Sequence, residues 1–131
     1  MSAVDAVLDG RREAEALMLD SCDVARPGEP VTDPETGDVT PSMTFVYSGP
    51  CKVQQTISQA SNPTAGSHAF TIQDSRVDFP VSAGPLMVDD VVTITASVLD
   101  PQLVGSEFRV VELFHKSMAT AQRTRVEQAT E

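Results

Sequence analysis

The chain lacks tryptophan and has few of the side chains that usually carry chemistry. Its 131 residues include one Tyr, five Phe, two Cys and two His. Small-molecule pockets are usually rich in aromatic side chains, so this composition argues against a ligand-binding pocket. Two cysteines are too few for a disulfide scaffold, and we expect both thiols to be reduced and buried.

Long apolar runs and an excess of basic residues are also missing. No apolar run approaches the roughly 20 residues that a membrane helix needs. The first 20 residues have no basic start and carry acids within their apolar part, so we expect no signal peptide and synthesis in the cytosol. The formal net charge of -10 argues against a role in wrapping nucleic acid or reading its sequence. An acidic surface would still suit a channel, because DNA passes it without sticking.

Residues 2–19 predict a helix at the start of a single domain that covers residues 1–131. Ser2 is a suitable N-cap, with Asp5 three residues later as in a capping box. Gly10 weakens the helix by about 1 kcal/mol relative to Ala. A helix with so few apolar residues needs a partner surface, either in its own domain or on a neighbouring subunit.

The remainder, residues 22–128, is predicted to be mainly β, a small β-barrel of about six to seven antiparallel strands. The expected strands cover residues 22–26, 44–48, 51–57, 70–81, 91–98, 107–114 and 122–128. Residues 27–41 are rich in Pro, Gly and Asp and are interpreted as an excursion with a turn at DPETGD. Residues 58–75 lack an apolar period, and we predict a long flexible loop between strands there, whose end overlaps the next strand.

Cys51 is the first candidate for chemistry. A nucleophilic cysteine needs a base and an electropositive setting, and Lys52 would point to the opposite face of the strand. Neither His68 nor His115 stands in a known cysteine-protease context, and no second His or Cys has metal spacing to His115. A disulfide with Cys22 is disfavoured by the compartment, so we interpret Cys51 as a buried strand residue.

The acidic turns are the other candidates. Asp33, Glu35 and Asp38 have the spacing of a loose calcium loop, but the D-x-D-x-D-G core and the distal bidentate Glu are missing, which favours a turn. Asp89 and Asp90 favour a turn into the next strand over a catalytic pair. The chain has neither a phosphate-binding glycine loop nor a nucleophile elbow. We therefore predict that the protein is not an enzyme and has no metal or cofactor site.

Three longer strings resemble a known group of proteins. They are RREAEALMLDSCDVAR, DPETGDVTPSMTFVYSGPCKVQ and VDDVVTITASVLDPQLVGSEFRVVELFHKSMATAQRTRVEQ. The chain resembles, over nearly its whole length, the small structural proteins of actinobacterial tailed phages encoded among the head–tail connector genes. The Gly-Pro-Cys-basic-Val-Gln run and the Asp-Pro-x-Leu-x-Gly-x-x-Phe-Arg-Val run are the distinctive parts. One departure is VDDVV, where the family more often has a glycine before the second Asp, which affects the local turn geometry.

The resemblance implies a head-completion protein, the stopper that closes the DNA channel of the phage neck. Such proteins are β-barrels with a helix that form homo-oligomeric rings, and a hexamer is favoured over a dodecamer. A long loop reaches toward the channel axis and retains the packaged DNA. The candidate gating residues carried over to this chain are Gln59, Ser61, Asn62, Thr64, Gly66, Ser67 and His68. Apart from the resemblance, the distribution of basic residues itself has two interpretations, solvated faces or contacts to acidic neighbouring subunits. The candidate contact residues are Arg11, Arg12, Lys116, Arg123 and Arg125.

The same resemblance implies the partners and the location. Portal and adaptor proteins would lie above the ring, and the tail terminator or tail tube would dock below it. Double-stranded viral DNA would pass through without sequence-specific binding, and no membrane would be involved. The protein would be assembled in the host cytoplasm and reside in the virion neck. The alternatives are a tail terminator or other tail-completion protein and, from another class, a monomeric ligand-binding β-barrel.

Overall fold

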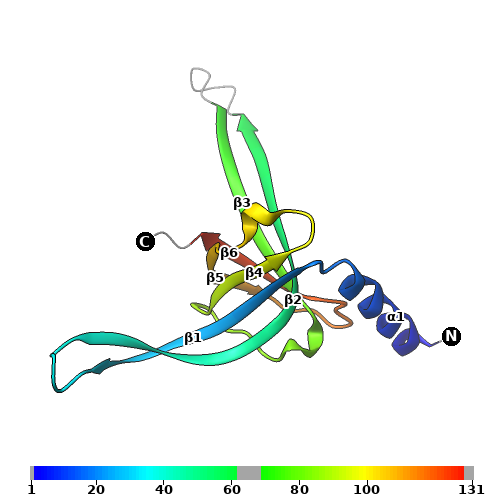
Figure 1. Ribbon diagram of the computed structural model, residues 1–131. Helices are drawn as coiled ribbons and strands as arrows, with labels where there is room; N and C mark the ends of the chain where they lie inside the picture. Colours follow the sequence, from blue (N-terminus) through cyan, green and yellow to red (C-terminus); the bar gives the residue numbers. More distant parts are fainter. Residues whose placement is uncertain (1, 62–68, 129–131) are drawn as a thin grey trace.

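The protein is a closed six-stranded barrel with one N-terminal helix (Figure 1). In the computed structural model the backbone is described for residues 2–61 and 69–128, and the side chains for residues 2–54 and 75–128. The elements are α1 (Ala3–Ala16), β1 (Asp20–Thr32), β2 (Val39–Ser61), β3 (Ala69–Phe79), the 3-10 turn η1 (Val81–Ala83), β4 (Val91–Ser97), the 3-10 turn η2 (Pro101–Leu103), β5 (Glu107–Phe114) and β6 (Gln122–Gln128).

The ring runs β1-β2-β3-β6-β5-β4, and every neighbouring pair is antiparallel. The predicted mainly β barrel with an N-terminal helix is confirmed. The strands number six because the segments expected at 44–48 and 51–57 belong to the single strand β2. β6 lies between β3 and β5, so the last strand in sequence joins two strands that are far apart along the chain.

One apolar core fills the interior of the barrel. In β5, for example, Phe108 and Val110 are buried, whereas the alternating residues Glu107 and Arg109 are exposed, as expected of a barrel strand. The core consists of Cys22, Val24, Cys51, Val77, Phe79, Leu86, Val92, Ile94, Phe108, Val110 and Val126. These side chains occupy the space in which a larger barrel would hold a ligand.

Helix α1 begins with the predicted capping box. The Ser2 hydroxyl accepts a hydrogen bond from the Asp5 amide at 3.1 Å, and the Ser2 amide donates to the Asp5 carboxylate at 3.4 Å. The helix ends at Ala16, earlier than the predicted residue 19, because the chain turns there into β1. Gly10 lies against the segment before β6: a Cβ at this position would come 2.8 Å from Thr120 Cγ2. Among the described residues, no helix is long and apolar enough to cross a membrane.

A two-stranded arm, residues 26–45, extends from the barrel on the side opposite α1 (Figure 1). β1 pairs with both β4 and β2 from Asp20 to Ala25, but in the described backbone it pairs with β2 alone from Arg26 onward. The predicted excursion at residues 27–41, with its turn at DPETGD, forms most of this arm, but the expected strand bounds were too short because residues 27–32 and 39–41 belong to β1 and β2. Prolines are tolerated here because each strand of the arm is an edge strand, and the ladder is irregular between Pro27 and Pro30.

The loop predicted over residues 58–75 is also shorter than expected. β2 and β3 remain paired from Lys52↔Asp78 to Ser61↔Ala69, so Gln59 and Ser61 belong to β2. In the described backbone, β3 pairs with β6 from Ser75 to Phe79. The part of the β2–β3 hairpin before Ser75 therefore needs no apolar face, which explains why residues 58–75 lack an apolar period. The remaining predicted gating residues, Asn62, Thr64, Gly66, Ser67 and His68, lie outside the described residues.

Candidate functional site

The two cysteines are buried together in the barrel wall between β1 and β2. Cys22 and Cys51 are both free thiols with no exposed surface. A hydrogen bond with Cys51 and burial raise the pKa of Cys22 well above its ordinary value, which favours the protonated, unreactive thiol. The interpretation of Cys51 as a buried strand residue is confirmed, and the thiol pair is not arranged as a nucleophile.

The predicted acidic turns have structural partners. The carboxylate of Asp33 accepts a hydrogen bond from the Glu35 amide at 2.9 Å, so the DPETGD segment is the tight turn at the tip of the arm. Asp89 has a φ of 77° and pairs with Arg109 at 2.6 Å. In the part of the chain that the structure describes, no group of three or more His, Cys, Asp or Glu side chains is arranged to hold a metal ion.

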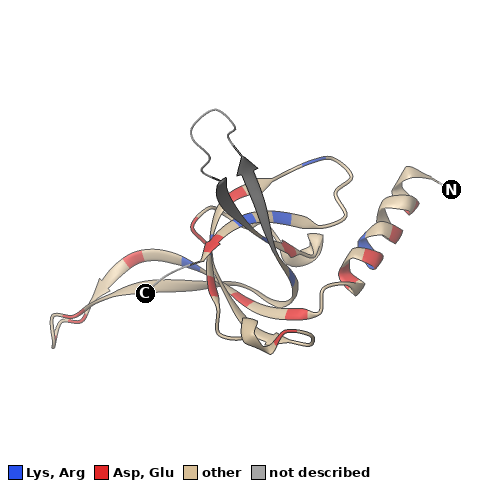
Figure 2. Ribbon diagram, turned by 90° about the horizontal axis from the view of Figure 1, so that it is seen from above, with Lys and Arg blue, Asp and Glu red and all other residues tan. Residues whose placement is uncertain are grey.

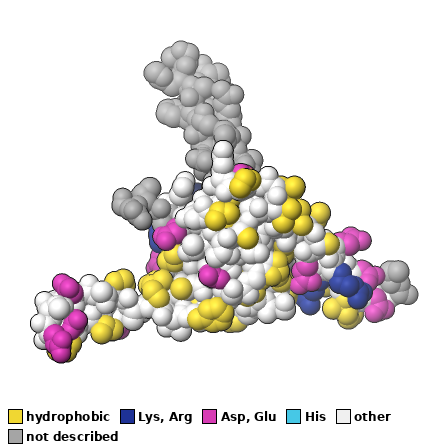
Figure 3. Space-filling view, in the orientation of Figure 1, with side chains coloured by type: hydrophobic (Ala, Val, Ile, Leu, Met, Phe, Trp, Pro, Cys, Tyr) yellow, Lys and Arg dark blue, Asp and Glu magenta, His cyan; other side chains and the backbone are white. Residues whose placement is uncertain are grey.

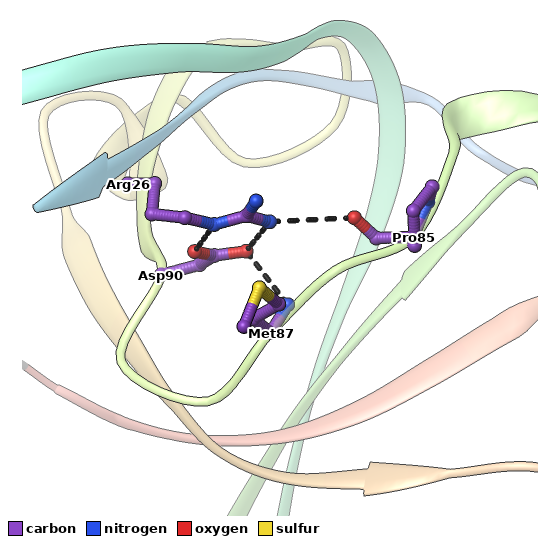
Figure 4. A network of polar contacts seen from close by, with 4 residues as sticks. All are labelled: Arg26, Pro85, Met87 and Asp90. Atoms are coloured by element: carbon purple, nitrogen blue, oxygen red, sulfur yellow. Dashed lines mark hydrogen bonds and ion pairs between the residues drawn. The ribbon is translucent and has the colours of Figure 1, made fainter.

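Asp90 is fully buried and lies at the base of the arm (Figure 4). Arg26 donates to both of its carboxylate oxygens, from Nε at 2.9 Å and from Nη2 at 3.1 Å. The Met87 amide donates to the same carboxylate at 2.8 Å, and Arg26 Nη2 also reaches the Pro85 carbonyl at 3.4 Å. The hydrogen bond to Asp90 raises the pKa of Arg26 further. The pair therefore ties the arm to the segment before β4, a structural task that leaves Asp90 no free oxygen for catalysis.

A cluster of bases lies on the outer side of the barrel next to α1. Lys52, Asp78 and Arg123 are cross-strand neighbours on β2, β3 and β6. Arg76 pairs with Asp78 at 3.1 Å between Nε and Oδ1. Burial raises the pKa of Asp78, while the surrounding bases lower it. Three cations thus surround one nearly buried carboxylate, which leaves an excess of positive charge.

Two adjoining pockets extend this cluster, one beside α1 and one beside the segment before β6. Lys52, Arg76 and Arg123 line a pocket of about 150 Å³ together with Ala14 and Leu17 of the helix. Arg123 also lines a neighbouring pocket of about 100 Å³ with the exposed Lys116. We call Lys52, Arg76, Lys116 and Arg123 the basic face.

An apolar groove continues from the basic face toward the N-terminal end of α1. It has a volume of about 380 Å³ and is lined by Ala3, Val4, Val7, Leu8, Arg11 and Met118. Val4 is 67% exposed and Met118 is 60% exposed, so this groove presents apolar side chains to solvent. Arg11 Nε donates to the Ala119 carbonyl at 3.0 Å and thereby fastens the helix to the segment before β6. We call this the helix groove.

The arm differs from this end of the molecule in charge. Residues 27–51 contain four acids and neither Lys nor Arg. The acids are Glu29, Asp33, Glu35 and Asp38, and all are exposed. Four large apolar side chains of the arm are exposed as well, namely Val31, Val39, Met43 and Phe45. Figure 3 shows acidic and apolar side chains gathered at the end of the arm, and Figure 2 shows the arm and α1 at opposite ends of the molecule.

The structure brings some of the predicted contact residues together and leaves others apart. Lys116 and Arg123 share the basic face, whereas Arg11 lies in the helix groove. Arg12 is exposed and pairs with Asp9 within the helix. Arg125 lies two residues after Arg123 in β6, on the same face of the strand, and its Nη1 is 3.9 Å from Glu112 Oε2.

Sequence reasoning did not single out Lys52 or Arg76 as candidate contact residues. Strand alternation alone places Lys52 on the outside, but only the order β2-β3-β6 puts it beside Arg123.

Residues 10–127 match the sequence model of a family of unknown function, DUF6093. The match begins within α1 and ends in β6, so it includes the whole barrel and the arm. A comparison with curated proteins found no match.

Proposed function

The chain belongs to the DUF6093 family, and we propose that it is a structural ring component of a phage neck. In this proposal it is the stopper that closes the DNA channel below the portal and adaptor and offers a docking surface to the tail. The observation that carries the proposal is that α1 and the arm extend from opposite ends of a closed barrel (Figure 1). Contacts between two different surfaces of one chain produce rings when the rotation closes.

The exposed apolar side chains support assembly. Phe45 of the arm is 72% exposed and Val4 of α1 is 67% exposed. Soluble monomers seldom leave large contiguous apolar patches uncovered, so such surfaces generally mark contacts with other chains. Both elements are accordingly suited to subunit contacts.

The filled interior supports a structural role over a ligand-binding barrel. Phe79 and Phe108, the largest fully buried side chains among the described residues, lie within the barrel core. Ligand sites are usually concave, apolar and preformed, and the space that would serve as one here is occupied.

The charge and the sequence resemblance support the position in the neck. A net charge of -10 suits a conduit through which DNA must move without adhering. The resemblance to phage connector proteins, carried by the Gly-Pro-Cys-basic-Val-Gln run at residues 49–54, favours the stopper.

Removing the gene for this chain from a phage that encodes it tests the proposal. We expect heads that fill with DNA but lose it and carry no tails, together with free tails of normal length. Adding the purified protein to portal–adaptor complexes should produce a further ring in negative-stain images. Heads that retain DNA beside tails of irregular length would instead identify a tail terminator. Normal virions without the protein would refute both neck positions.

A further inference from the structure

The arm has the properties of a segment that is covered by another molecule. From Arg26 to Thr32 the described part of β1 pairs with β2 alone. A two-stranded hairpin without further packing is at best marginally stable in water. The apolar side chains that it exposes, at Val31, Val39, Met43 and Phe45, are available for a partner surface.

The α1 end of the same chain offers the complementary chemistry. The basic face carries three cations around Asp78, and Lys116 adds a fourth at its margin. Beyond Arg26 at its base, the arm carries four exposed acids and neither Lys nor Arg. The helix groove exposes apolar side chains next to the basic face, just as the arm exposes apolar side chains next to its acids.

The two features also match in length. The seven residues of β1 in the arm, from Arg26 to Thr32, span about 23 Å at the rise of a β-strand. The 14 residues of α1 span about 21 Å at the rise of an α-helix. An arm laid along the helix would therefore reach both the groove and the basic face.

We infer that the arm of one copy of this chain docks along α1 of the next copy, with its acids on the basic face and its apolar side chains in the helix groove. This inference rests on the proposed ring. Because the arm and α1 lie at opposite ends of one chain, such contacts add copies in a single direction, and they close into a ring when the rotation from one copy to the next closes (Figure 1, Figure 2). The acids and bases align the copies, and the apolar side chains exclude water.

Charge reversal on either side of the contact tests the inference. The arm variant carries Glu35→Lys and Asp38→Lys, and the face variant carries Lys116→Glu and Arg123→Glu; all four positions are exposed. We expect each variant alone to lose at least about tenfold in affinity for ring assembly on portal–adaptor complexes, since like charges then oppose each other. Glu107→Lys, a single charge reversal at an exposed position of β5, is the control and should assemble normally.

Mixing the two variants is the decisive step. In a mixture, the face variant still has an acidic arm, which can dock on the unaltered basic face of the arm variant. The arm variant has a basic arm, which can dock on the acidic face of the face variant. An equimolar mixture should therefore recover rings in which the two variants alternate, and native mass spectrometry would show equal amounts of each. Lys116→Glu with the matching single change Glu35→Lys repeats the test if the double face variant does not fold.

The outcomes separate this contact from the proposed function. Wild-type rings together with variants that assemble equally well would overturn the contact and leave the neck proposal standing. Variants that fail alone and also fail when mixed would overturn it too. A short DNA duplex that binds the basic face and leaves ring assembly unchanged would assign that face to DNA instead. A wild type that forms no ring on portal–adaptor complexes would overturn the proposed function itself.

Discussion

Arg26 and Asp90 form a bidentate ion pair at the point where the arm leaves the barrel. The two contacts measure 2.9 Å and 3.1 Å, and Asp90 has no exposed surface. The backbone of Asp90 is also bonded to β5, because the Val110 amide donates to its carbonyl at 2.9 Å. The direction of the arm is thus set by a side chain that is itself fixed in the barrel wall.

Replacing this carboxylate should destabilise the fold. In Asp90→Asn the amide NH₂ would face the guanidinium donors of Arg26, so we expect a loss of about 2–3 kcal/mol in the free energy of unfolding. Asp89→Asn is the matched control, because Asp89 is exposed and its pair with Arg109 contributes less than about 1 kcal/mol. Urea unfolding measures both values, and equal losses in the two variants would contradict the structural role of Asp90.

The thiols should be unreactive in the folded protein. The hydrogen bond with Cys51 and burial raise the pKa of Cys22, and both sulfurs are inaccessible. We expect iodoacetamide at pH 8 to leave the native protein unmodified and to alkylate both cysteines in denaturant. Mass spectrometry reads the result directly. Rapid labelling of the native protein would mean that β1 and β2 open far more readily than the closed barrel suggests.

The effect of Gly10→Ala on the free energy of unfolding should depend on the residue at position 120. Alanine is a better helix former than glycine by about 1 kcal/mol, but a Cβ here would come 2.8 Å from Thr120 Cγ2. We expect Gly10→Ala to stabilise the Thr120→Ala variant by about that amount and to stabilise the wild type less or not at all. A double-mutant cycle from thermal unfolding measures the difference. Equal effects in both backgrounds would show that the helix does not rest on this segment.

Asp78 should make part of the stability depend on pH. Burial raises its pKa, so the folded protein retains this proton to a higher pH than the unfolded chain does. Stability then falls as the pH rises from the unfolded value of about 4 through the folded pKa. We expect wild type to gain stability relative to Asp78→Asn as the pH is lowered from about 7 to about 4. The other carboxylates titrate in both proteins and cancel, so a constant or opposite difference would contradict the raised pKa.

Local features of the fold could be predicted from the sequence. Ser2 and Asp5 specify the helix start within four residues, and the alternation around Cys51 places its side chain inward. Such signals are short in range, and they do not depend on which strands become neighbours. The predictions of the capping box and of the buried Cys51 were accordingly correct.

The arm and the basic face could not be predicted, for two different physical reasons. The prolines at 27, 30 and 41 normally interrupt a sheet, and they are tolerated because no third strand pairs with the arm in the described backbone. The basic face depends on the order of strands, since Lys52 and Arg123 are brought near each other by the placement of β3 between β2 and β6. Hydrophobic periodicity indicates strands but does not specify this order.

The arm is a part of the fold whose length can vary independently of the core. One residue added to each of its strands lengthens the hairpin by about 3.3 Å, and no core residue has to move. A single insertion in a barrel strand would instead turn its inward side chains to the solvent. Length variation among family members should therefore concentrate between residues 27 and 44 and adjust the spacing of neighbouring copies, while the barrel keeps a constant size.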